Sequence, residues 1–221
     1  MALNQRRRQK QLARKAAQAS ARAKALRAGG ARRVEAGGSF HPASPAWPVH
    51  DAWISDAIRK MRQGTVILSR KLGDAVTVAV FLVDVGCMGV KSAFGRSMHV
   101  STYAEFLERF RGREDLIGSG PACVRKLVEG AVSYASDLGF PPDPDYRRVR
   151  ALFGDIDPLE CAREFEFGDN GKPSYVSGPY DSPARVRSVM EQLRRKCGPD
   201  GFHFMVASPE AFGDDLGDLD E

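Results

Sequence analysis

The spacing of apolar positions predicts helices in five places between residues 50 and 209. Apolar side chains that recur every three or four residues are typical of a helix packed on one face. Proline favours the first helical turn, and glycine favours the residue after the last. Asp51 is the predicted N-cap of the first helix, and Thr102 and Glu105 form a predicted capping box for the second. The five expected helices span residues 51–64, 102–110, 121–139, 144–153 and 183–198.

Shorter apolar runs predict strands. Residues 76–85 are almost continuously apolar, as expected for a central strand that is covered on both faces. The Gly73-Asp74 pair suits a two-residue turn from residues 65–68 into that strand, and residues 90–94 predict a third strand. Residues 165–167, the turn at 169–172 and residues 175–176 predict a hairpin, whose second strand Pro173 confines to a sheet edge. Residues 202–206 predict a last strand, with His203 facing outward.

The order of these elements predicts the fold class. Strands come early, helices follow, and a hairpin–helix–strand unit ends the chain, without the alternation typical of a parallel sheet. We therefore expect an α+β fold: one domain over residues 50–209, with a largely antiparallel sheet packed by about five helices. A basic arm (1–40) and a proline-containing linker (41–49) precede it, and an acidic, disordered tail (210–221) follows. No apolar run approaches the roughly 18 residues of a membrane span, so we expect a soluble protein without a membrane partner.

Charge is distributed very unevenly along the chain. Among 221 residues, 33 are Lys or Arg and 28 are Asp or Glu, which gives a formal net charge of +5. Residues 1–36 carry +10, with Glu35 as the single acid, and residues 210–221 carry −6. The residues between them therefore carry +1. The bases of the arm are Arg6, Arg7, Arg8, Lys10, Arg14, Lys15, Arg22, Lys24, Arg27, Arg32 and Arg33.

The arm has three open interpretations. Residues 4–28 are rich in helix formers but offer only a narrow apolar stripe, so we expect a fraying helix or a disordered segment. It is a solvated extension without a partner, an organelle transit peptide, or a segment that binds the phosphates of RNA or DNA. Residues 1–36 contain no aromatic side chain, so any nucleic-acid contact there would be with the backbone.

The cysteines predict no metal site. Cys87, Cys123, Cys161 and Cys197 are widely and evenly spaced, whereas zinc ligands usually come in close pairs. We expect four reduced thiols in a reducing compartment. Cys87 follows the predicted central strand in a glycine-flanked turn, and His99 comes twelve residues later. A Cys–His pair could activate a thiolate, although a packed cysteine and a surface histidine would give the same pattern.

Three carboxylates are the other candidates for chemistry. Asp84 ends an apolar run, so it must lie at the strand end, pair with a base such as Lys91, or bind a ligand. Asp155 and Asp157 follow a helix. If they converged with Asp84, the three could hold Mg²⁺, which prefers oxygen ligands. Alternatively, Asp155 and Asp157 form a turn or a cap before Pro158.

Two functions from different classes follow from these patterns. The leading hypothesis is a non-enzymatic, cytoplasmic protein without a cofactor, which binds RNA or DNA, or associates with the ribosome, through its arm. The alternative is a small Mg²⁺-dependent hydrolase or nuclease that uses Asp84, Asp155 and Asp157. The acidic tail adds a third possibility, in which it mimics phosphate and folds back onto the arm. P-loop, nucleophile-elbow, zinc-protease and EF-hand motifs are all missing from the sequence.

Overall fold

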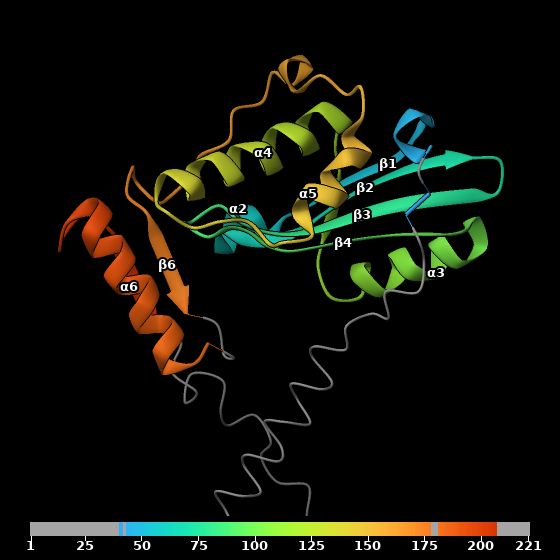
Figure 1. Cartoon of the computed structure of the whole chain (residues 1–221). Helices are drawn as coiled ribbons and strands as arrows, with labels where there is room; N and C mark the ends of the chain where they lie inside the picture. The colour runs from blue at the N-terminus through green and yellow to red at the C-terminus, as the bar shows by residue number, and fades with distance from the viewer. Residues whose placement is uncertain (1–39, 42, 178–180, 207–221) are drawn as a thin grey trace, which may run out of the picture. The chain divides into compact units, whose positions relative to one another are not determined.

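A computed structural model describes residues 40–41, 43–177 and 181–206, which belong to one compact unit beginning at Phe40 (Figure 1). The predictions for the basic arm and the acidic tail lie outside the described residues, apart from Phe40. Among the described helices, none is long and apolar enough to cross a membrane.

The main sheet has five antiparallel strands in the order β4-β3-β2-β1-β5. Their bounds are β1 Val49–Ser55, β2 Gln63–Leu72, β3 Ala75–Asp84, β4 Gly89–His99 and β5 Leu116–Gly118. The predicted two-residue turn joins β2 to β3, with Gly73 in the left-handed region (φ 58°). The strand predicted to be central, β3, is an interior strand next to the middle strand β2. The expected α+β class with an antiparallel sheet is therefore confirmed.

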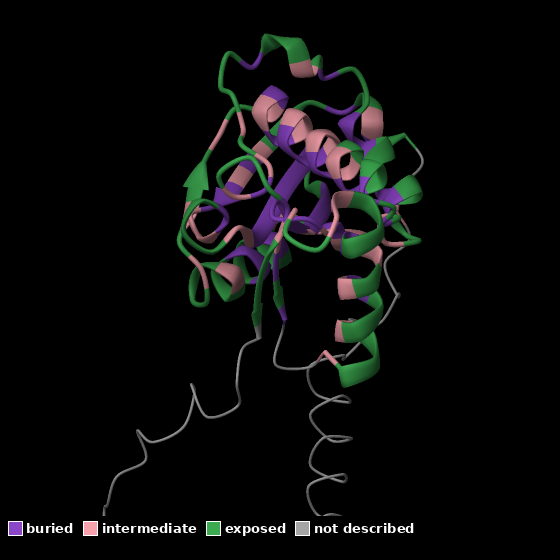
Figure 2. Ribbon diagram, turned by 90° about the vertical axis from the view of Figure 1, so that its left-hand side faces the viewer, coloured by how far each residue is buried: buried purple, intermediate pink, exposed green. Residues whose placement is uncertain are grey.

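Helices cover both faces of this sheet (Figure 1). Helix α4 (Pro121–Asp137), helix α5 (Tyr146–Val149) and the 3-10 turn η2 (Arg150–Phe153) pack on one face. Helix α3 (Val100–Arg111) packs on the other. The strands between the two layers are the most buried part of the molecule (Figure 2). This explains the continuous apolar run of β3, because its side chains enter two separate cores.

The helix predicted over residues 51–64 is wrong. Residues 49–55 form β1, and only a short helix, α2 (Ala57–Met61), follows. Ala52 and Ile54 face the core under α4, while Trp53 between them packs into the core under α3. A strand that is buried on both faces has several apolar residues in a row. Over so short a stretch, such a run also contains the three- and four-residue spacings of a helix.

The predicted linker is part of the folded unit. Ser44 and Trp47 are buried, a 3-10 turn, η1 (Ser44–Ala46), lies between residues 43 and 47, and β1 begins at Val49. The predicted capping box of α3 does not form either. The N-cap of α3 is His99, whose Nδ1 accepts a hydrogen bond from the Ser101 N–H at 3.3 Å.

The C-terminal segment contains a second sheet, in which β6 (Ser174–Ser177) and β7 (His203–Val206) pair in parallel. Helix α6 (Pro183–Cys197) connects them, as its proline start and glycine end predicted. The hairpin expected over residues 165–176 is absent, and an isolated bridge between Asp169 and Lys172 takes its place. Phe167 stacks on Tyr134 of α4 instead of entering a strand. Tertiary packing therefore overrides the local turn signal.

Candidate functional site

Asp84 holds a loop together at the end of β3. Its side chain is buried, and Oδ1 accepts hydrogen bonds from the backbone N–H groups of Gly86 (2.9 Å), Cys87 (3.0 Å) and Met88 (3.3 Å). Burial raises the pKa of Asp84, while these hydrogen bonds act in the opposite direction. The Lys91 ammonium donates its hydrogen bond to Gln63 rather than to Asp84. Asp84 thus satisfies the backbone of the β3–β4 loop.

Asp155 and Asp157 have separate structural partners. Asp155 is exposed and forms an ion pair with the buried Arg70 guanidinium at 2.9 Å, which lowers the pKa of that carboxyl. Asp157 accepts a hydrogen bond from the Leu159 N–H at 2.9 Å and caps the 3-10 turn η3 (Pro158–Glu160). Asp157 therefore has the cap role that the sequence left open, whereas Asp155 pairs with a buried base that the sequence did not point to.

The three carboxylates do not converge. Asp84 is opposite Gln63 on β2, whereas Asp155 binds Arg70, which is farther along the same strand. At about 3.3 Å per residue, these two points on β2 are roughly 23 Å apart. In the part of the chain that the structure describes, no group of three or more His, Cys, Asp or Glu side chains is placed to hold a metal ion. Among the described residues, Asp84, Asp155 and Asp157 therefore do not form one Mg²⁺ site.

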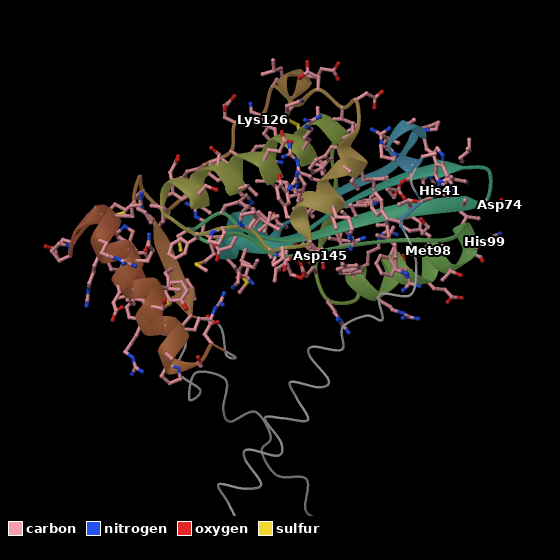
Figure 3. All side chains as sticks on the ribbon, in the orientation of Figure 1. His41, Asp74, Met98, His99, Lys126 and Asp145 are labelled. Carbon is pink, nitrogen blue, oxygen red and sulfur yellow. A yellow bond between two sulfur atoms is a disulfide. The ribbon has the colours of Figure 1, made fainter. Side chains whose placement is uncertain are left out.

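Cys87 and His99 lie at opposite ends of the sheet. Cys87 follows the end of β3 at Asp84, while His99 is opposite Ala75 at the start of that strand and beside the turn at Asp74 (Figure 3). Cys87 is fully buried, and burial raises the pKa of its thiol. The structure thus contains a packed cysteine and a surface histidine in place of a catalytic pair.

The expectation of four reduced thiols is wrong for two of them. Cys123 and Cys161 form a disulfide with a Cα–Cα distance of 5.0 Å, while Cys87 and Cys197 are free. The bond joins the first turn of α4 to the segment after η3. Lys126 of α4 holds the same segment by donating to the Cys161 carbonyl oxygen at 3.2 Å. Sequence spacing could not reveal this pair, because the two cysteines are 38 residues apart and meet only through the packing of α4.

A small pocket with a volume of about 220 Å³ opens between β5 and residues 163–166. Ile54, Ile58 and Leu127 contribute to an apolar floor. Three acidic and three basic side chains line it, so the pocket has no net charge. Two of the bases are already in ion pairs, since Arg59 binds Asp56 and Arg62 binds Glu166. The pocket therefore has no clear attraction for an anion.

Helix α6 places a row of bases on the surface. Ser182 caps its first turn by accepting a hydrogen bond from the Arg185 N–H at 3.2 Å, and Gly198 ends it. Val189 and Leu193 are buried against β6 and the end of α4, while the outer side is exposed (Figure 2). The helix has one acid, Glu191, and five bases, so its net charge is +4. The five bases are Arg185, Arg187, Arg194, Arg195 and Lys196.

Among the described carboxylates, only one forms an ion pair with a base of α6. Arg185 forms an ion pair with Asp181 at 3.2 Å. Arg195 donates to the neutral side chain of Gln192 at 2.6 Å. Arg187, Arg194 and Lys196 form no ion pair with any of the described carboxylates. No described carboxylate neutralises these three charges.

Arg187, Arg194 and Arg195 form the α6 basic surface. Arg187 and Arg194 are seven residues apart and lie within about 20° of each other around the helix, while Arg195 lies about 80° from Arg187. Arg194 and Arg195 are in the last turn, where positive charge also stabilises the helix by interacting with its dipole. Arg187 is in the second turn, far from the C-terminal end of the helix, so the dipole does not explain it.

Sequence reasoning missed this surface although its signal was present. The apolar positions of the predicted helix, which include Val186, Met190 and Leu193, left the arginines on the outer side. The near-neutral charge of the whole body concealed this local excess.

No protein-family model matches this chain, and neither a curated protein nor a solved structure matches it.

Proposed function

We propose that this protein binds the phosphate backbone of nucleic acid, either as free RNA or DNA or as the RNA surface of a ribosome, and catalyses no reaction. The basic arm is the principal contact and the α6 basic surface is the second. The observation that carries the proposal is the charge of +10 on residues 1–36 ahead of a body that carries only +1. Each base that neutralises a phosphate releases a condensed counterion, which makes binding favourable and strongly dependent on salt.

The α6 basic surface gives the folded body a share in this contact. Arg187 and Arg194 form no ion pair with a described carboxylate, so approaching phosphates would not have to displace any of those carboxylates. Guanidinium groups also match the geometry of phosphate oxygens. We therefore expect the arm to supply most of the affinity and α6 to orient the nucleic acid on the body.

The test is a salt titration of binding to a labelled 20-nucleotide RNA and to a 20-base-pair DNA duplex. The proteins are the full chain, a chain that lacks residues 1–36, and a full chain with Arg187→Gln, Arg194→Gln and Arg195→Gln. A matched control replaces Arg109, Arg113 and Arg147 by Gln, since these arginines are exposed and form no ion pair with a described carboxylate. Deletion of the arm leaves the described unit intact, because that unit begins at Phe40.

We expect the deletion to remove most of the affinity and most of the salt dependence. The slope of log K against log salt should fall by about 0.7 to 0.9 for each phosphate that the protein no longer neutralises. The triple variant on α6 should weaken binding more than its matched control does. If the full chain binds neither probe, or if the deletion leaves affinity unchanged, the proposal is overturned.

A further inference from the structure

Phe204 on β7 presents part of an aromatic ring to solvent, with 40% of the residue exposed. Its ring stacks on that of Tyr175 on β6, with 6.0 Å between centroids and 14° between planes. Tyr175 is buried, and its hydroxyl donates a hydrogen bond to Asp181 at 3.0 Å. The Phe204 ring therefore rests on a fixed aromatic support.

The strand that carries Phe204 is the outer one of its sheet. Strand β6 is attached to the main unit, because the Ser174 N–H donates to the Gly86 carbonyl oxygen at 3.0 Å. Strand β7 pairs with β6 on the other side. Tyr175 packs with Val189 and Leu193 of α6, so Tyr175 and its register partner Phe204 lie on the face that α6 covers.

Two arginines of α6 point toward the same side as β7. Gln192 donates to the Leu138 carbonyl oxygen at 2.7 Å, so that side of the helix faces the end of α4. At about 100° per residue, Arg187 and Arg194 lie roughly 140° and 160° around the helix from Gln192. They therefore point away from α4, the direction in which β7 lies relative to β6.

We propose that Phe204 and the α6 basic surface form a site for single-stranded nucleic acid. A base of the strand stacks on the Phe204 ring, and the phosphates next to it contact Arg187 and Arg194. Single strands can offer a base face to an aromatic side chain, whereas neighbouring base pairs cover both faces of each base in a duplex. This inference rests on the proposed function and adds single strands to it as the class of ligand. The arm alone would contact only the backbone, which single strands and duplexes both offer.

The experiment compares two probes on the full chain, a labelled 20-nucleotide oligothymidylate and a 20-base-pair duplex. The test variant is Phe204→Leu, which keeps apolar packing on Tyr175 and removes the aromatic face. Phe204→Trp keeps an aromatic face and adds a fluorescent reporter. Met205→Leu is the matched control, since Met205 is next in β7, points to the opposite face and is 65% exposed.

We expect Phe204→Leu to weaken oligothymidylate binding by between roughly 5-fold and 100-fold, because a stacked base contributes about that factor. The affinity for the duplex should stay within twofold of the wild type, and the urea midpoint should be unchanged within error. Phe204→Trp should bind oligothymidylate as well as the wild type, with quenching of the added tryptophan fluorescence.

The outcomes separate this inference from the proposed function. If the full chain binds neither probe, both are overturned. If it binds both probes but Phe204→Leu changes the two affinities equally or not at all, only the stacking site is overturned. If the added tryptophan is not quenched on binding, the base does not stack at this position.

Discussion

Arg70 and Asp84 are the two buried charged residues in the described part of the chain, and both bind backbone groups. The Arg70 guanidinium donates to the carbonyl oxygens of Trp47 (2.6 Å), Leu152 (2.9 Å) and Phe153 (2.7 Å). Asp84 does the reverse, because it accepts hydrogen bonds from three N–H groups. A buried charge is tolerated when hydrogen bonds replace its lost hydration. At both ends of the sheet, therefore, a charged side chain fixes an irregular segment.

The pH dependence of stability tests this role for Asp84. Asp84→Asn keeps the acceptor oxygen and removes the charge, whereas Asp84→Ala leaves buried N–H groups without a partner. We expect the alanine variant to lose about 3 kcal/mol of unfolding free energy in urea at pH 7, and the asparagine variant to lose much less.

Burial raises the pKa of Asp84 in the folded state. Wild-type stability relative to Asp84→Asn should therefore fall as the pH rises from about 4, the unfolded value, through the raised pKa. A constant difference at every pH would contradict this account.

The elements differ in how clearly their residues specified them. Pro121 and Pro183 fixed the starts of α4 and α6. Proline suits the first helical turn because an N–H there would have no partner within the helix, and because the fixed φ of proline is already helical. Strand β1 carried a misleading pattern, since Trp53 and Ile54 enter different cores. The parallel pairing of β6 with β7 joins residues about 29 positions apart, which no local turn signal encodes.

Reduction of the Cys123–Cys161 disulfide should destabilise the segment that follows η3. In the chain-entropy model, a crosslink over 38 residues contributes roughly 3 to 4 kcal/mol. We expect a reductant to lower the urea midpoint of the wild type and to leave a Cys123→Ser, Cys161→Ser variant unaffected. Cys197→Ser is the control, and it should keep the sensitivity of the wild type because Cys197 is free. Thiol titration of the unfolded, unreduced chain should give two thiols, and a count of four would show that the bond is absent.

The two ends of the chain carry opposite charges, +10 on residues 1–36 and −6 on residues 210–221. A tail of this charge competes with phosphate for the same bases. We expect a full chain in which the six tail acids become Asn or Gln to bind oligothymidylate more tightly at low salt. The gain should vanish near 1 M salt, where the screening length is about 3 Å. The control replaces three exposed acids of the body, Asp74, Glu105 and Asp115, and the change in affinity is compared per charge removed. Equal effects per charge would show that the tail has no special role.

Several features of this protein depend only on neighbouring residues and can be predicted from the chain alone. These are the α+β class, the Gly73 turn, the proline-started helices and the separation of charge between the ends of the chain. Which distant residues meet depends instead on the packing of the whole domain. Packing separated Asp84 from Asp155, joined Cys123 to Cys161, and stacked Phe204 on Tyr175. Turn and helix preferences act over a few residues, whereas a site forms where packing brings distant segments together.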